Sequence, residues 1–338
     1  MRVFYSQSRY GNTWSDGMGP IADDVSSARP GYLASVSAPG GLYFWYVKTG
    51  AHAPTALFQS NSDATFRPVT VPVELSGTLQ GMGAIPLRGH RASGKELAFL
   101  FSAGSQASTG KSQISFQEVY TDNSVGQVQT KQFDSTGVVG SPTLAFYKDT
   151  FWAFYSDPTK SGYLQCTAFR LASSSLTELY TGRVTTGPLS ADLRAKTPVA
   201  TAVFADTLYI AYTSQEQESL NHLHVVTKRI HGSAMPIDSQ EAFAFSEPSA
   251  AYVPSVNQAF GDDRFIILDC NPAMCIYNGL LRLVYPDILG DKKLYELTYD
   301  GRNNFGIEKT FQGNNWTSDA IQVVAHNGSM YTFYYGAP

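Results

Sequence analysis

The stretch PTLAFYKDTFWAFYS, residues 142–156, contains two short apolar and aromatic runs on either side of Lys148 and Asp149. Proline costs no ladder hydrogen bond at the first residue of a strand, and a short polar break between two such runs is typical of a hairpin turn. The stretch therefore predicts a strand from Thr143, a tight turn, and a second strand from Phe151. No long stretch of the chain carries the 3.6-residue periodicity of a helix.

The same pattern recurs along the chain at a constant interval. Five prolines each lie 56 residues after the one before, and about 11 residues beyond each comes an aromatic or apolar run that we expect to be a second strand. Such self-similarity indicates an array of supersecondary units. The prolines are Pro30, Pro86, Pro142, Pro198 and Pro254, and the runs after them begin at Leu42 (LYFWY), Leu97 (LAFLF), Phe151 (FWAFY), Leu208 (LYIAY) and Phe265 (FIIL). A sixth run, from Met330 (MYTFYY), closes the chain.

Each repeat predicts four short antiparallel strands, which is the signature of a propeller blade, so the six runs predict an all-β, six-bladed β-propeller. We expect residues 1–338 to form one domain. Segments 1–18 and 318–338 each supply two strands, so we expect them to share the last blade and close the ring. A pair of β-sandwiches is the alternative, but it would not give a regular period. Segment 275–293 departs from the repeat, and we interpret it as an insertion forming a lid or short helix.

Composition limits the partners of the protein. The net charge is −4, which gives no electrostatic reason to expect nucleic acid as a partner. No apolar run approaches the roughly 18 residues that predict a membrane span, so we expect no membrane partner either. We expect a monomer or a homodimer.

Several signals bear on the compartment. Met1 leads straight into the predicted strand RVFY, so no signal peptide is visible. Cys270 and Cys275 flank NPAM and form either a disulfide, which would suit a secreted protein, or two free thiols. Sequons at Asn315 and Asn327 permit glycosylation. Together these features favour the secretory pathway or an extracellular location.

Several kinds of chemistry have no motif in this sequence. Neither GxxxxGK[ST], nor GxGxxG opening a helix, nor GxSxG occurs. His222 and His224 share a strand face, but no nearby carboxylate or cysteine completes a metal site, so we interpret them as surface residues and expect no metal and no cofactor. A glycosidase needs two carboxylates at one site, and the sequence alone brings no pair together. The available carboxylates include Asp157, Asp192, Asp269 and Glu296.

The segment LYELTYDG, residues 294–301, resembles the third strand of the fungal fucose-specific lectins, which are six-bladed propellers. The resemblance covers the whole chain. It implies a carbohydrate-binding protein in which an Arg at the start of a second strand and a Glu on the third strand hold the sugar hydroxyls, while an aromatic ring stacks on the apolar face of the sugar. It thereby implies Arg264, Glu296 and Trp316 as candidate sugar-binding residues.

The sugar-binding residues implied by the resemblance are not repeated from blade to blade. The other predicted second strands start at Leu42, Glu96, Phe151, Leu208 and Met330 rather than at Arg. A multivalent lectin gains avidity by repeating its pocket. The chain therefore favours a single site, at the central channel where the inner strands converge.

Two functions remain open. The chain also resembles lectin-like propellers that fungi use as hetero-Diels–Alderases in tropolone–sesquiterpenoid biosynthesis. This implies a cofactor-free enzyme of secondary metabolism that couples a tropolone quinone methide with a sesquiterpene, both small and apolar or aromatic. The reaction needs two reactants held in a near-attack geometry and donors on the diene carbonyl. The alternative is a fucose-binding lectin with one or two surviving sites for a fucose-type sugar.

For a central site, candidates come from the second strands and from the loops that enter the inner strands. Arg194 and Asn257 are the expected catalytic donors to a ligand carbonyl, since the strand pattern requires neither. Trp45 lies on a second strand, where it either walls the pocket or packs between blades. The expected substrate-binding residues are Tyr32, Trp45, Met82, Lys196, Tyr252 and Gln322.

Overall fold

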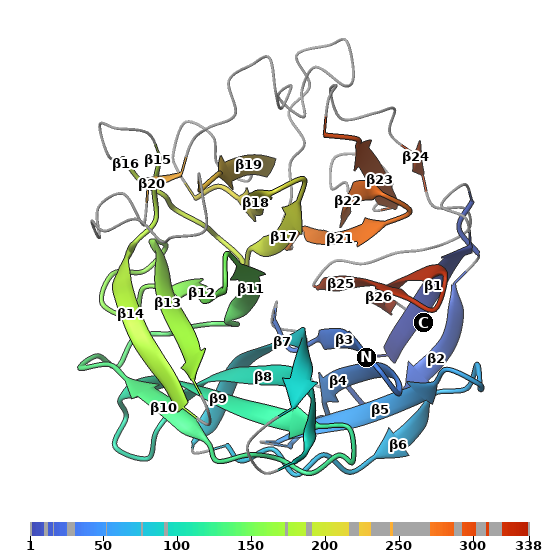
Figure 1. Cartoon of the computed structure of the whole chain (residues 1–338), viewed down its shortest axis with the longest axis horizontal. Helices are drawn as coiled ribbons and strands as arrows, with labels where there is room; N and C mark the ends of the chain where they lie inside the picture. Colours follow the sequence, from blue (N-terminus) through green and yellow to red (C-terminus); the bar gives the residue numbers. More distant parts are fainter. Residues whose placement is uncertain are drawn as a thin grey trace.

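The structure is a computed structural model. It describes residues 2–9, 13–15, 17–25, 31–51, 53–75, 77–90, 94–172, 175–186, 191–215, 223–230, 244–245, 271–286, 293–301, 309–310 and 320–336. These residues form an all-β, six-bladed propeller around a central channel (Figure 1). Within them, no helix has the length and apolar character needed to cross a membrane.

Three blades are built from the two chain termini and the first part of the sequence, and each has four described strands. The closing blade contains β25 (Ile321–His326), β26 (Ser329–Gly336), β1 (Arg2–Arg9) and β2 (Met18–Ala22). The first blade contains β3 (Ala34–Ala38), β4 (Gly41–Val47), β5 (Pro54–Ser60) and β6 (Arg67–Val69). The second blade contains β7 (Thr78–His90), β8 (Glu96–Gln106), β9 (Ser112–Tyr120) and β10 (Gln129–Gln132).

The other three blades follow in chain order. The third contains β11 (Thr143–Tyr147), β12 (Thr150–Ser156), β13 (Leu164–Ala172) and β14 (Ser175–Arg183). The fourth contains the described strands β17 (Ala200–Phe204), β18 (Thr207–Thr213) and β19 (Leu223–Lys228). The fifth contains β21 (Ala273–Tyr277), β22 (Leu280–Pro286), β23 (Leu294–Tyr299) and β24 (Lys309–Thr310). A small sheet joins β15 (Thr185–Thr186), β16 (Ala191–Asp192) and β20 (Ala244–Phe245).

The two ends of the chain close the ring. β1 pairs antiparallel with β26 from Arg2 opposite Gly336 to Arg9 opposite Ser329, and the two termini lie near each other in Figure 1. Inner strands contact one another in the order β25, β3, β7, β11, β17, β21 and back to β25. The predicted closure by both terminal segments is therefore confirmed, although its outermost strand β2 ends at Ala22 rather than within residues 1–18.

The tight turns that join first and second strands adopt a left-handed backbone. Lys148 and Asp149 have φ values of 51° and 54°, and Asn327 and Gly328 have 45° and 70°. Hairpin turns of the type that suits strand twist require positive φ at both central residues, which Asn, Asp and Gly adopt at the lowest cost. The strand, turn and strand predicted within residues 142–156 are confirmed as β11 and β12.

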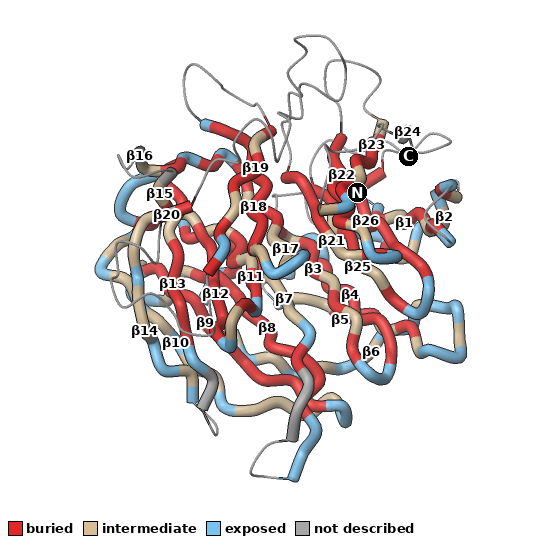
Figure 2. The backbone as a smooth tube through the Cα atoms, turned by 45° about the horizontal axis from the view of Figure 1, so that its top comes forward, coloured by how far each residue is buried: buried red, intermediate tan, exposed pale blue. Residues whose placement is uncertain are grey.

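Aromatic side chains from second strands fill the seams between blades. Phe44 of the first blade stacks on Phe333 of the closing blade with ring centroids 4.4 Å apart, and Trp45 meets Phe99 of the second blade edge-on at 5.2 Å. Figure 2 shows that buried residues run along the strands while exposed residues gather at turns and outer edges. Burial of this apolar surface is the main force that holds neighbouring blades together.

The sequence prediction assigned the wrong segment to the second strand of the fifth blade. Its second strand is β22 (Leu280–Pro286), not the run from Phe265, which lies outside the described residues. Consequently residues 275–293 are not an insertion, since they contain the end of the inner strand β21 and the whole of β22. The proline that precedes the inner strand here is Pro272, because more residues separate this blade from the fourth than the 56-residue period allows. A run of apolar residues cannot by itself reveal which strand it forms.

Pro86 also departs from its predicted place at a strand start. It lies inside β7, opposite Phe99, next to an irregularity in the register. β7 is the inner edge strand of its sheet, and edge strands and register irregularities are the places where a sheet tolerates proline. The regular proline spacing thus overstates the regularity of the fold.

Candidate functional site

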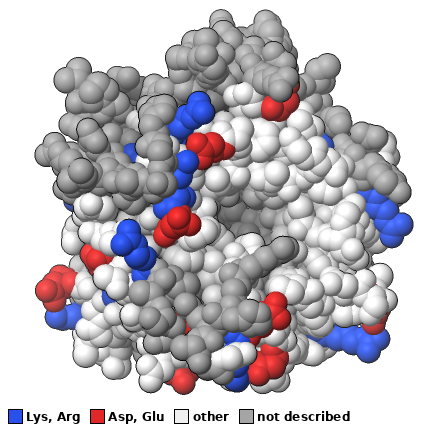
Figure 3. All heavy atoms as spheres, in the orientation of Figure 1, with Lys and Arg blue, Asp and Glu red and all other residues white. Residues whose placement is uncertain are grey.

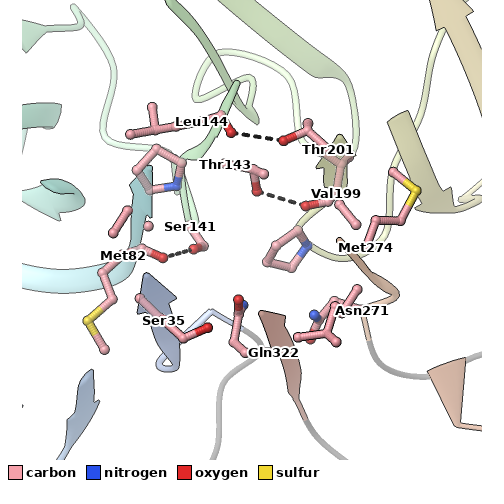
Figure 4. A pocket seen from close by; sticks show the side chains of 18 of the residues that line it. Ser35, Met82, Ser141, Thr143, Leu144, Val199, Thr201, Asn271, Met274 and Gln322 are labelled. Atoms are coloured by element: carbon pink, nitrogen blue, oxygen red, sulfur yellow. Dashed lines mark hydrogen bonds between the residues drawn. The ribbon is translucent and has the colours of Figure 1, made fainter. Parts of the chain in front are cut away.

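The inner strands of all six blades converge on a pocket at the centre of the ring, where Figure 3 shows a hollow. Its cavity volume is about 120 Å³. Its described lining contains no Asp, Glu, Lys, Arg or His, so the walls are electrically neutral. The polar residues that line it are Ser35, Ser141, Thr143, Thr201, Asn271 and Gln322 (Figure 4). Met82 and Met274 also line it, but their side chains point away from the cavity.

Most of these polar side chains tie one inner strand to the next. The hydroxyl of Thr143 donates to the carbonyl of Val199 over 2.8 Å, and that of Thr201 donates back to the carbonyl of Leu144 over 2.9 Å. Asn271 Nδ2 donates to the carbonyl of Ile321 over 2.8 Å. Since these donors are already used, their residues hold the ring together rather than offering hydrogen bonds to a ligand.

Ser35 and Gln322 differ from the rest of the wall. They belong to β3 and β25, which face each other across the seam between the first and closing blades, and both point into the cavity in Figure 4. The hydroxyl of Ser35 is buried without a hydrogen-bond partner. The amide of Gln322 is half-buried and makes no hydrogen bond to the described residues. Together they leave one hydroxyl and one amide free to bind a group inside the pocket.

Two of the predicted substrate-binding residues, Met82 and Gln322, line the central pocket. The side chain of Met82 points away from the cavity and packs in the core between the first two blades, whereas Gln322 presents its amide to the cavity. Their placement agrees with a central site, and their role in binding stays a prediction.

Four other predicted residues lie away from the pocket. Trp45 is buried in the seam between the first two blades, and the phenol of Tyr32 donates to the carbonyl of Leu79 over 3.0 Å. Arg194 and Lys196 are exposed on the segment that leads into β17, and the guanidinium of Arg194 lies against the ring of Tyr163. Arg194 is thus not among the residues that line the central pocket, and its role as a donor to a ligand stays a prediction.

The remaining predicted residues, Tyr252, Asn257, Arg264 and Trp316, lie outside the described residues. Cys270 lies outside them as well, and Cys275 is a free thiol.

Sequence reasoning missed Ser35 and Asn271. A signal for Ser35 was present, since ASVSA at residues 34–38 alternates small apolar residues with serines, as expected for an inner strand with one polar face. For Asn271 there was no local signal, because its partner Ile321 is 50 residues further along the chain.

A second group of functional residue types lies between the fifth and closing blades. Arg282 Nη1 donates to Glu296 Oε1 over 2.5 Å, and Trp14 Nε1 donates to Glu296 Oε2 over 2.7 Å. The exposed fractions of Arg282, Glu296 and Trp14 are 3%, 0% and 5%. Thus Glu296 has an arginine on the second strand and an aromatic ring from the next blade, as the lectin resemblance implies. The arginine is Arg282 rather than Arg264, and the three side chains are buried and bind one another.

This buried trio is not repeated around the ring. Arg282 lies three residues after the last residue of its hairpin turn, and in four other blades the same position holds an aromatic side chain. Glu296 pairs with the residue two positions after Arg282, and the pairing of second and third strands gives the equivalent residue in those blades. None of those positions carries a charge. The first position holds Tyr43, Trp152, Tyr209 and Tyr331, and the second holds Ala56, Cys166, Val225 and Tyr5.

Two carboxylates considered for glycoside hydrolysis do meet, but on an arginine. Arg183 Nε lies 2.7 Å from Asp157 Oδ2, and Arg183 Nη1 lies 3.3 Å from Asp192 Oδ2. Burial raises the pKa of Asp157, but hydrogen bonds from Thr159 and Arg183 outweigh it, so the net pKa is lowered. A glycosidase needs one carboxyl group whose pKa is raised so that it can donate a proton. This pair therefore stabilises Arg183 instead.

The interpretation of His224 as a surface residue changes. His224 is half-buried and stacks on Tyr212 with ring centroids 5.4 Å apart, so it is not a free surface residue, while His222 lies outside the described residues. No group of three or more His, Cys, Asp or Glu suited to hold a metal ion occurs in the described part of the chain.

The comparisons with known proteins agree with this fold. No protein-family model and no curated protein matches the chain. In structure it is similar to the six-bladed lectin of Aleuria aurantia, with a TM-score of 0.54 and 13% identity over 92% of this chain and 87% of that one. It is also similar to the α-L-arabinanase of Penicillium chrysogenum complexed with arabinobiose, with a TM-score of 0.58 and 11% identity over 92% and 94%. Likeness at these identities shows the fold alone: a six-bladed propeller resembling fucose lectins and glycosidases.

Proposed function

We propose that the central pocket is the functional site and that it binds one small, neutral, oxygenated molecule. The observation that carries this proposal is the pair Ser35 and Gln322, whose hydroxyl and amide have no hydrogen-bond partner among the described residues, in a wall where other polar groups are paired. A buried polar group without a partner costs about 1–3 kcal/mol. A ligand carbonyl or hydroxyl that accepts from these groups recovers that free energy.

We propose further that the ligand is a tropolone quinone methide and that the protein couples it with a sesquiterpene alkene in a hetero-Diels–Alder reaction. The carbonyl oxygen and the terminal carbon of the heterodiene form bonds to the two alkene carbons. A dihydropyran results, no group leaves, and no electrons or protons are supplied from outside. For this reaction the protein needs only to orient the two reactants and to stabilise charge on one oxygen.

The pocket suits that limited demand. With about 120 Å³ of space, it admits the oxygenated end of the diene rather than both reactants whole. The amide N–H of Gln322 then donates to the carbonyl oxygen, where negative charge builds as the new bonds form. Ser35 orients the same group from the opposite side of the seam.

The experiment measures the rate of coupling of a reactive tropolone quinone methide with a cyclic sesquiterpene alkene. Loss of one hydrogen bond of about 1.4 kcal/mol predicts a roughly tenfold lower kcat/KM for Gln322→Ala. Gln132→Ala, an exposed glutamine on β10, is the matched control and should leave the rate unchanged. No acceleration over the uncatalysed reaction, or equal rates for Gln322→Ala, Ser35→Ala and the control, would refute this function.

A second candidate function, binding of a fucose-type sugar, is favoured by the buried trio Arg282, Glu296 and Trp14. These are the side-chain types that the lectin resemblance implies, and the similar Aleuria aurantia protein is described by its fucose recognition. A sugar would have to displace Trp14 from Glu296, which makes this reading the weaker one. Calorimetric titration with L-fucose and methyl fucoside separates the two. Millimolar binding that Arg282→Ala abolishes would favour the lectin over the central pocket.

A further inference from the structure

Three cationic side chains surround the ring of Tyr163 where the third and fourth blades meet. The ammonium of Lys160 lies 4.2 Å from the ring centroid, and the guanidinium carbons of Arg183 and Arg194 lie 4.8 Å and 4.5 Å from it. A backbone bridge between Tyr163 and Arg194 fixes this contact. Cations are attracted to the face of an aromatic ring, but three of them around one ring repel each other unless anions compensate.

Among the described residues, carboxylates compensate only one of the three cations. Arg183 has the carboxylates of Asp157 and Asp192 at 2.7 Å and 3.3 Å. Lys160 and Arg194 are exposed, and neither forms an ion pair with a carboxylate of the described residues. The two therefore leave a local excess of positive charge beside the ring.

The phenol of Tyr163 adds a third donor. Hydrogen bonds from Lys160 and Arg194 to its oxygen hold the pKa of the phenol below its usual value. With those bonds accepted, the oxygen still carries its own hydrogen, which is not donated to any residue that the structure describes. Ammonium, guanidinium and phenol hydrogens thus meet at one place.

The cluster lies on the segment that leads into the inner strand β17, since Arg194 precedes Pro198, a residue of the pocket wall, by four positions.

We propose that Lys160, Arg194 and Tyr163 form a binding site for a small oxyanion where the third and fourth blades meet. An oxygen of a carboxylate or phosphate accepts from the ammonium and the guanidinium, and a second oxygen accepts from the phenol. Charge-assisted hydrogen bonds of this kind are the strong ones, and the anion removes the repulsion between the two free cations. The site does not depend on the function proposed for Ser35 and Gln322.

The test titrates the full chain with inorganic phosphate and, separately, with benzoate. Because Lys160 and Arg194 are exposed, we expect a Kd on the order of 1 mM at low salt, weakening sharply at 1 M NaCl, where the Debye length is about 3 Å. The readout is the tyrosinate absorbance of wild type minus that of Tyr163→Phe across pH, because a bound anion raises the pH at which the phenol ionises.

Lys160→Met and Arg194→Met should each weaken binding about tenfold. Lys111→Met, at an exposed lysine of the second blade, is the control and should bind as wild type does, as should Gln322→Ala. Phosphate binding without benzoate binding identifies a free inorganic anion as the ligand, and comparable benzoate binding identifies the acidic group of an organic molecule; either supports the site. Absence of both, or equal affinity in all variants, overturns it.

Discussion

The buried trio makes a quantitative prediction about stability. Replacing Arg282 by Met keeps the apolar stem but removes the guanidinium that donates to Glu296 over 2.5 Å. Glu296 has no exposed surface, so its carboxylate would keep the hydrogen bond from Trp14 and lose its counter-charge. Breaking a buried ion pair by removing one partner costs about 3–5 kcal/mol, and we expect Arg282→Met to lower the free energy of unfolding by that amount.

The assay is urea unfolding followed by tryptophan fluorescence, with the free energy taken from linear extrapolation. The double variant Arg282→Met/Glu296→Leu should recover most of the loss, because apolar replacement of a whole buried pair is often neutral or stabilising. Lys111→Met breaks an ion pair with Asp134 whose side chains are 50% and 94% exposed, so its midpoint should not move. A midpoint for Arg282→Met equal to that of this control would refute the reasoning.

The seams between blades carry the other predictions. His326 Nδ1 lies 2.9 Å from the hydroxyl of Ser37, and burial lowers the pKa of His326, so the unfolded chain takes up its proton at a higher pH than the folded one. The contribution of His326 to the stability of the folded protein is therefore complete above about pH 6.5 and is lost as pH falls below that value. The test compares urea midpoints at pH 7.5 and pH 5 after those of His326→Gln at the same pH are subtracted, and equal differences would contradict this. Thr201→Val removes the bond to the carbonyl of Leu144 and should cost about 0.5–1.5 kcal/mol by the same measurement. Phe333→Ala should cost about 3–5 kcal/mol, whereas Phe146→Ala, at a site 42% exposed, should cost much less; similar losses would contradict the packing described for the seam.

Local patterns were sufficient to predict most of the fold. Tight turns such as Lys148–Asp149 and Asn327–Gly328 depend on the backbone preferences of their own residues, so they can be read directly from the chain. The fifth blade could not be read this way. Apolar runs at Phe265 and Leu280 look alike in the sequence, and only pairing with β21 and β23 decides that the second one is the second strand.

The candidate site was predictable in place but not in most of its residues. The lack of a repeated sugar-binding pattern pointed to the channel, and Met82 and Gln322 do line it. Arg194 was expected there because nothing in the strand pattern required it. The structure places it against Tyr163 instead, because a backbone bridge joins the two residues and a cation is attracted to the face of an aromatic ring.

By itself, the sequence determined the strand pattern, the turns and the closure of the ring, because these follow from side-chain alternation and backbone preferences within a few neighbouring residues. Tertiary structure alone decided which polar groups are satisfied and which are left free. Trp14 reaches Glu296 across 282 positions of the chain, and Ser35 faces Gln322 across the seam between the first and closing blades. Whether a buried donor has a partner depends on such distant strands, and no local pattern encodes it.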